Sequence, residues 1–493
     1  MTSRTIKTFL YSLIILIPVI ITILLIGTVL HSSITNFSPS WSDEIDYWIQ
    51  IRSFKDVGFK SGYFSVNELI SNSSFSHYGT HGPMFPMLFG SLARIFGWKD
   101  YSGPVFNLAL LCSSLAFFLW LTKPDLKKSV FVLIILLFSY QMFLYIPSLM
   151  QESINFVFAI IFCALFIRMY VFKDPSKYIL AGILLMVFIA SLFRILWLLA
   201  AFPIFWSMLR NSKGNRKKTV FVIITIVFFI LFSVFLYFYW TSSYPGGFLY
   251  KLTHARTGLS MIELAFAQII MNIRKLFGLN MVYHKSEFVA RYLFILVVIL
   301  FVFKMNKERN VVFSTLFILL STLLTTIFLY DIGNFRILAP FLLFSLLVMV
   351  FVFDPKFLWK TMIVYTVLNV ITIGFFITNY RDILSDHYLN NSSVSENLED
   401  NEFSQLRYLP ESNAWCNSLV STRVYTKEFI QLTPGIGLNI LYDLQETGSS
   451  LHSHYLLVPY EVLATNGIVS TCEVIKTYDN GDILCQRIND GCL

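Results

Sequence analysis

The chain has 493 residues, of which 56% are hydrophobic and only 13% are charged. Soluble globular domains carry roughly 25% charged residues, so this composition excludes an ordinary soluble protein and indicates a polytopic membrane protein. The formal net charge of +8 is informative through the positions of Lys and Arg, which mark cytoplasmic loops, and does not indicate nucleic-acid binding.

The first apolar run covers 9–30 and follows two basic residues, Arg4 and Lys7. With roughly 22 residues it is longer than the apolar core of a signal peptide, and no convincing small-residue cleavage site follows it. The sequence therefore predicts a retained first transmembrane helix.

The densest acidic cluster of the chain, SWSDEIDYW, lies about ten residues beyond this run and contains Asp43, Glu44 and Asp46. The segment after the cluster and the segment 83–98 are both apolar on one helical face, which is typical of helices that lie on a membrane surface. We expect two such interfacial helices in an outer loop at about 31–101, with the carboxylates held at the membrane surface.

The same loop ends in HYGTHGPMFP, so His81 is a candidate neighbour of the carboxylates. Two adjacent carboxylates near lipid should have at least one raised pKa, which suits a general base. The alternative is purely structural, with Ser42 or Asp43 capping a helix that begins at Glu44.

Later apolar runs long enough to span a bilayer occur at about 102–121, 129–147, 153–172, 219–240, 289–304, 311–329, 336–353 and 361–378. The run 178–209 is too long for one ordinary helix, and two short crossings that turn near Arg194 place the basic block 210–218 in the cytoplasm. We therefore expect an all-α membrane domain at 1–378 with about 11 transmembrane helices, the N-terminus inside and the C-terminus outside.

This topology predicts a second outer loop at about 241–288, with an amphipathic helix near 259–277. The loop also carries His254 and Arg256. It would either cover a lipid or acceptor groove or serve as a solvated connection.

The remaining residues, 379–493, are polar and contain Cys416, Cys472, Cys485 and Cys492. We expect a small extracytoplasmic α/β domain with up to two disulfides, because an oxidising compartment and the lack of a Cys-x-x-Cys pair argue against zinc. A two-residue turn at Asn480-Gly481 predicts a hairpin in which Cys472 and Cys485 are not paired directly.

Several motifs resemble those of the C-type glycosyltransferases, in particular the aminoarabinose-transferase and protein O-mannosyltransferase-like branch. They are SDEIDYW after the first helix, HGPMFPMLFGSLARIFGW before the second, SLFRILWLLAAFP around Arg194 and GNFRILAPFLL around Arg336. The last is similar to the Arg-Tyr-Leu-x-Pro segment of these enzymes, with Ile337 in place of Tyr.

The resemblance implies an integral plasma-membrane enzyme that transfers a sugar from a polyprenyl-phosphate donor to an acceptor hydroxyl, with inversion, at the outer membrane surface. Asp43 would be the general base and Glu44 would orient Asp43 or the acceptor. Asp46 and His81 are candidates for substrate binding, with the alternative that Asp46 is only part of the helix that follows the motif. Arg194 and Arg336 are candidates for binding the donor phosphate, and Lys285 is a weaker third.

The acceptor could be a lipid, a glycan or a protein. No cofactor or resident metal is assigned, although a divalent ion at the acidic motif is left open, because some relatives use one. Two alternative functions are a transporter or flippase of lipid-linked glycans and a non-catalytic membrane scaffold. Nearly every acidic residue falls in a predicted loop and no repeat is apparent, which disfavours transport. The intact Asp-Glu pair disfavours the scaffold.

Overall fold

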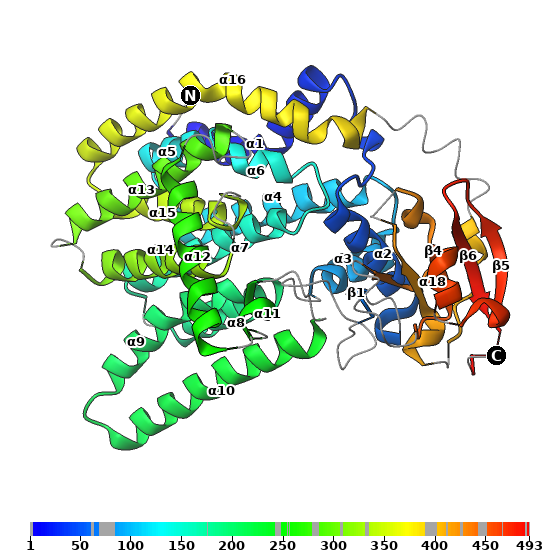
Figure 1. Ribbon diagram of the computed structural model, residues 1–493. Helices are drawn as coiled ribbons and strands as arrows, with labels where there is room; N and C mark the ends of the chain where they lie inside the picture. The colour runs from blue at the N-terminus through cyan, green and yellow to red at the C-terminus, as the bar shows by residue number, and fades with distance from the viewer. Residues whose placement is uncertain are drawn as a thin grey trace.

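The computed structural model describes residues 3–60, 64–68, 84–174, 176–241, 248–253, 255, 257–278, 285–305, 309–330, 335–389, 402–410, 413–423, 427–441, 451–465, 467–488 and 491–492. Its long helices form a bundle, and its strands gather in a domain beside one end of that bundle (Figure 1).

Long apolar segments form the bundle because only helices satisfy their own backbone hydrogen bonds in lipid. They are α1 (Ser3–Val29), α4 (Ser102–Thr122), α5 (Leu126–Leu137), α6 (Tyr140–Tyr145), α7 (Glu152–Phe166), α8 (Lys177–Phe193), α9 (Ala201–Ser212), α10 (Arg216–Trp240), α13 (Lys285–Lys304), α14 (Arg309–Leu329), α15 (Ala339–Val352) and α16 (Pro355–Tyr388).

Among the described residues, seven helical stretches are long and apolar enough to cross a membrane, and three more apolar helices are shorter. Large apolar side chains on their outer faces are exposed, as expected where lipid is the solvent. The chain is therefore built as an integral membrane protein, whereas the count of eleven crossings and their orientation stay predictions.

The long apolar run 178–209 is interrupted where a turn was predicted. Helix α8 ends at Phe193, Arg194 has an extended backbone, and a 3-10 segment, η4 (Ile195–Ala200), leads into α9. Arg194 is 4% exposed, so the break places a buried guanidinium at the junction of two helices.

Two helices follow α1 where the sequence predicted amphipathic interfacial helices. The second is amphipathic, but the first is buried on all sides from Glu44 to Ile51, so the prediction that it lies on the membrane surface is wrong. Helix α2 (Ser42–Val57) packs on α3 (Met84–Phe96), which buries Phe85 and Phe89 and leaves Ile95 and Phe96 more than 70% exposed. The second loop contains α11 (Phe248–Thr253) and the amphipathic α12 (Gly258–Phe277), close to the predicted helix at 259–277.

The C-terminal domain is built on a six-stranded sheet in the order β1-β3-β2-β4-β6-β5. Strands β2 (Ser418–Ser421), β3 (Gly437–Ile440) and β4 (Tyr455–Pro459) are parallel, and β5 (Cys472–Thr477) and β6 (Asp482–Arg487) form an antiparallel hairpin. A short helix, α18 (Tyr460–Thr465), follows β4. The predicted α/β character of the tail is confirmed for the described residues.

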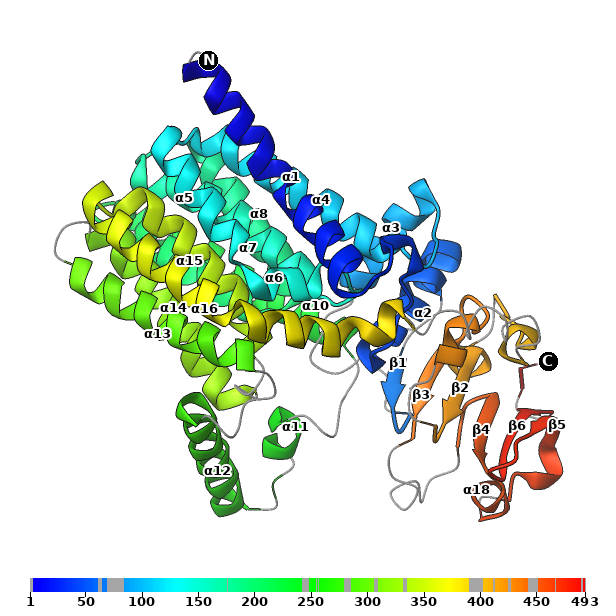
Figure 2. The same ribbon diagram turned by 90° about the horizontal axis from the view of Figure 1, so that it is seen from above.

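The sheet also contains a strand from the first loop. Strand β1 (Phe64–Val66) pairs in parallel with β3. Just after β1, both carboxylate oxygens of Glu68 accept hydrogen bonds from the backbone of His452 and Ser453, at 2.8 and 2.9 Å. A segment of the first loop therefore completes the sheet of the C-terminal domain, where β1 lies beside β3 (Figure 2).

The tail has two disulfides, as the sequence allowed, but the prediction that Cys472 and Cys485 are not paired directly is wrong. The disulfides are Cys416–Cys492 and Cys472–Cys485. A bulge between Val474 and Lys476 shifts the hairpin register, so Cys485 lies opposite Val474 and becomes the diagonal neighbour of Cys472 on the same face. A regular two-residue turn at Asn480-Gly481 would instead place Cys485 opposite Lys476.

Candidate active site

Helix α2 begins with the acidic motif. Asp43 and Glu44 occupy its first turn, where the positive end of the helix dipole favours carboxylates. Glu44 Oε2 accepts hydrogen bonds from the backbone N–H groups of Ser40 and Trp41, at 3.1 and 3.2 Å. Glu44 therefore fixes the start of the helix, in the manner of a capping box.

Glu44 also joins α2 to two distant parts of the chain. Its Oε1 accepts a hydrogen bond from the backbone N–H of Leu149 at 2.7 Å, and its Oε2 lies 2.6 Å from Nε2 of His387 near the end of α16. The side chains of Glu44 and His387 are fully buried. Since both Glu44 oxygens have protein partners, this carboxylate holds the acidic motif in place.

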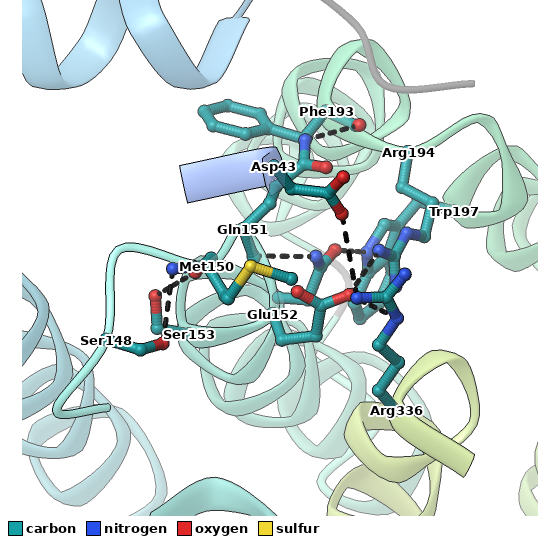
Figure 3. Close-up of polar contacts among 11 residues, drawn as sticks. Asp43, Ser148, Met150, Gln151, Glu152, Ser153, Phe193, Arg194, Trp197 and Arg336 are labelled. Atoms are coloured by element: carbon teal, nitrogen blue, oxygen red, sulfur yellow. Dashed lines mark hydrogen bonds and ion pairs between the residues drawn. The ribbon is translucent and has the colours of Figure 1, made fainter. Parts of the chain in front are cut away.

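Glu152 is the first residue of α7, and its side chain is 1% exposed. Its Oε1 accepts a hydrogen bond from Nη2 of Arg194 at 2.8 Å and lies 3.4 Å from Nε of Arg336. Arg336 belongs to a short 3-10 segment, η6 (Phe335–Ile337), just before α15. Figure 3 shows Glu152 between the two guanidinium groups.

Arg336 also reaches the acidic motif. Its Nη1 lies 3.8 Å from Oδ2 of Asp43, and the side chains of Asp43 and Arg336 are 21% and 25% exposed. We call Asp43, Glu152, Arg194 and Arg336 the charge cluster. It contains two carboxylates and two guanidinium groups, and its accessible part is the Asp43–Arg336 pair.

The cluster's electrostatics suit a base. Burial raises the pKa of Asp43 above that of a free aspartate, Arg336 opposes this shift, and Glu152 adds to it. In the part of the chain that the structure describes, Nη1 of Arg194 is buried without a hydrogen-bond partner. The cluster can therefore offer a proton acceptor at Asp43 and a cationic donor of hydrogen bonds to an anion.

Of the other predicted site residues, only some lie in the part of the chain that the structure describes. Asp46 lies one turn further along α2 and is 2% exposed. His81 lies outside the described residues, and Lys285 begins α13 with its side chain outside the described part. The structure thus brings together Asp43, Arg194 and Arg336 from the predicted set.

Glu152 was missed by the sequence analysis. The signal was present as the polar step Gln151-Glu152-Ser153 between two apolar stretches, because a carboxylate at the end of a membrane helix needs a buried partner. Its neighbour Gln151 donates a hydrogen bond to the carbonyl of Phe193, next to Arg194, at 2.6 Å. The turn before α7 is thus tied to the helix break that carries Arg194.

Among the described residues, no group of three or more His, Cys, Asp or Glu side chains is arranged to hold a metal ion. The carboxylates of the cluster are paired with arginines instead.

Comparison with solved structures identifies the fold. The structure is similar to ArnT from Cupriavidus metallidurans bound to undecaprenyl phosphate, with a TM-score of 0.53, 8% identity and coverage of 95% of this chain and 97% of that chain. For ArnT in the apo state the TM-score is 0.51, with 9% identity and the same coverage. For the oligosaccharyltransferase AglB from Archaeoglobus fulgidus, in complex with an inhibitory peptide and a dolichol-phosphate, the TM-score is 0.47, with 11% identity over 87% of this chain and 64% of that chain.

Neither protein-family models nor curated proteins give a match. The likeness to ArnT therefore rests on three-dimensional structure and concerns the fold. It shows that the chain has the fold that the resemblance implied.

Proposed function

We propose that this chain is a membrane glycosyltransferase that moves a sugar from a polyprenyl-phosphate donor to an acceptor hydroxyl at the outer membrane surface. The observation that carries the proposal is the accessible pair of Asp43 and Arg336, 3.8 Å apart and backed by the buried Glu152. The ArnT fold, solved in that protein with undecaprenyl phosphate, supports a lipid-phosphate donor.

In this mechanism Asp43 takes the proton of the acceptor hydroxyl as the oxygen attacks the anomeric carbon, and the configuration at that carbon inverts. The bond between the anomeric carbon and the phosphate oxygen breaks, and the lipid phosphate leaves with the electron pair. The raised pKa of Asp43 makes it a stronger base than a free aspartate.

Arg336 and Arg194 stabilise the charge that develops on the departing phosphate. Arg336 is the accessible one, and Arg194 has a buried Nη1 that is left without a hydrogen-bond partner among the described residues. Glu152 keeps both guanidinium groups in place between turnovers and is a positioning residue, as is Glu44 through its backbone contacts. Lys285, His81 and Asp46 remain candidates for contacts with the sugar or the phosphate.

The lipid tail explains why such a site belongs at the end of a helix bundle. A polyprenyl chain stays in the bilayer while its phosphate lies at headgroup level, where a charged cluster can be partly hydrated. The acceptor and the donor sugar are not assigned by these contacts. A transporter or flippase would place its ionisable residues along the mid-membrane path, whereas this cluster lies at helix ends.

The test is transfer of radiolabelled sugar from a panel of polyprenyl-phosphate donors in membranes that carry wild type or Asp43→Asn. We expect transfer by the wild type and a loss of at least about a hundredfold in Asp43→Asn, at equal protein level and donor binding. Asp56→Asn, at the exposed far end of the same helix, is the matched control and should transfer normally. Normal transfer by Asp43→Asn would return Asp43 to a structural role.

A further inference from the structure

A cavity lies within the bundle between α6, α7, α13, α15 and α16. Its empty space is about 520 Å³ when the open solvent at its mouth is counted. The walls are mostly apolar, with side chains such as Phe156, Leu293 and Leu343. Along α15 the lining runs from Ala339 to Leu346, about two helical turns or roughly 10 Å.

One polar side chain in this wall has no partner. Gln141 of α6 is 7% exposed, and within the described part of the chain neither its amide nitrogen nor its amide oxygen makes a hydrogen bond. In contrast, Tyr140 Oη donates to the carbonyl of Asn369, and Asn369 Nδ2 donates to the carbonyl of Tyr365, both at 2.8 Å. A buried amide without a partner is unfavourable, so Gln141 indicates a ligand that carries a hydrogen-bonding group.

The cavity begins close to the charge cluster. Gln141 and Tyr145 are four residues apart on α6 and so share one face of it, and the Tyr145 ring lies 6.4 Å from that of Trp41, two residues before Asp43. On α15 the first lining residue, Ala339, is one turn beyond Arg336. A chain in the cavity would therefore have its head beside the cluster.

We propose that this cavity binds one hydrocarbon chain of a bilayer amphiphile that carries an ester, amide or hydroxyl group near its head, and that Gln141 hydrogen-bonds to that group. A polyprenyl chain has no hydrogen-bonding group along its length and would leave the Gln141 amide unpaired. The occupant is therefore distinct from the tail of the donor. This proposal rests on the proposed function only in taking the charge cluster as the place where sugar transfer occurs.

Photolabelling of the full-length protein in lipid nanodiscs tests this site. The two probes are phosphatidylglycerol with a diazirine in one acyl chain and polyprenyl phosphate with a diazirine in its tail, and labelled peptides are mapped. We expect the phosphatidylglycerol probe to label the 138–142 and 339–346 segments, and Gln141→Leu to reduce this labelling about five- to tenfold.

Ala290→Phe fills the cavity and should abolish the labelling, whereas Ile299→Phe, at an exposed position of the same helix, should leave it unchanged. The proposal is overturned if the polyprenyl probe labels these segments as strongly as phosphatidylglycerol does. It is equally overturned if Gln141→Leu is labelled like the wild type.

The amphiphile has two sources, a resident bilayer lipid or a lipid-borne acceptor, and the transfer assay separates them. If Ala290→Phe raises KM for the acceptor and leaves KM for the donor unchanged, the chain belongs to the acceptor. If both KM values are unchanged and added phosphatidylglycerol no longer raises the Tm of the purified variant, the occupant is a resident lipid. Labelling requires no turnover, so a wild type that transfers no sugar would refute the proposed function and leave the labelling result standing.

Discussion

Replacing Glu152 by Gln removes the charge that holds two buried guanidinium groups and keeps the size of the side chain. Glu152 Oε1 lies 2.8 Å from Arg194 and 3.4 Å from Arg336. At an effective dielectric constant of about 20, the two attractions amount to about 6 and 5 kcal/mol before the cost of desolvation is counted. Glu152→Gln is therefore expected to be among the most damaging single substitutions in the chain.

The net effect is smaller than these attractions. The cost of removing water from the buried ions offsets part of the attraction. In addition, Arg336 is 25% exposed, so solvent screens its attraction to Glu152. Removing one partner of a buried ion pair typically costs about 3 to 5 kcal/mol. We expect a loss of that size, mainly because Arg194, at 5% side-chain exposure, is left without a carboxylate.

Equilibrium unfolding by SDS in mixed micelles measures this loss. Asp174→Asn is the matched control, because Asp174 pairs with Arg168 at 2.6 Å but the two side chains are 20% and 34% exposed. The control should cost less than about 1 kcal/mol. If Glu152→Gln costs no more than Asp174→Asn, Glu152 does not hold the arginines as the structure indicates.

Three further predictions follow from the contacts. Asp43 must be ionised to act as a base, and burial raises its pKa, so the acid-side fall of kcat/KM should occur at a higher pH than an ordinary aspartate would give. Arg336→Gln should move this fall to still higher pH, because the positive charge that lowers the Asp43 pKa is lost, whereas Arg336→Lys keeps the charge and should not. Profiles of kcat/KM against pH measure both effects. Arg52 of α2 donates hydrogen bonds to the carbonyls of Ile430 and Leu432 in the C-terminal domain. Arg52→Met should therefore lower stability by about 1 to 3 kcal/mol and speed proteolysis of that domain, and an unchanged cleavage rate would show that these contacts do not hold the domain against α2. Removing Cys416–Cys492, which closes a loop of 76 residues, should lower the free energy of unfolding by about 4.5 kcal/mol, and removing Cys472–Cys485, which closes 13, by about 3 kcal/mol. Equal losses would contradict the explanation by loop entropy.

Most helices of the membrane part could be predicted from the sequence because apolar length is a strong local signal. The run at 129–147, however, was expected as one crossing and forms α5 and α6, with a break after Leu137. The break at Arg194 and the amphipathic α3 and α12 were also visible as local patterns, whereas the burial of α2 on all sides was not. Pairings between distant segments carry no such pattern. The addition of β1 to the sheet and the bulge beside Val474, which sets the disulfide pairing, could be found only in three dimensions.

The candidate site was predictable to the same degree. Asp43, Arg194 and Arg336 were each found from a local motif, but the residue that joins the arginines was not. Glu152 lies at the start of an apolar helix and has no motif of its own, and its importance comes from two partners 42 and 184 positions further along the chain. The part played by Glu44 depends on His387, 343 residues away, and could not be foreseen either.

The contacts of β1 also set an order of events during synthesis. Glu68 and His452 are 384 residues apart, and a ribosome working at roughly 5 to 20 residues per second needs about 20 to 80 seconds to travel between them. Throughout that interval the loop that follows the acidic motif has no sheet to join, and the far end of α2 lacks the partners of Arg52. The C-terminal domain can therefore close only after translation has passed every bundle helix, so the acidic motif acquires its final support as one of the last steps in making the protein.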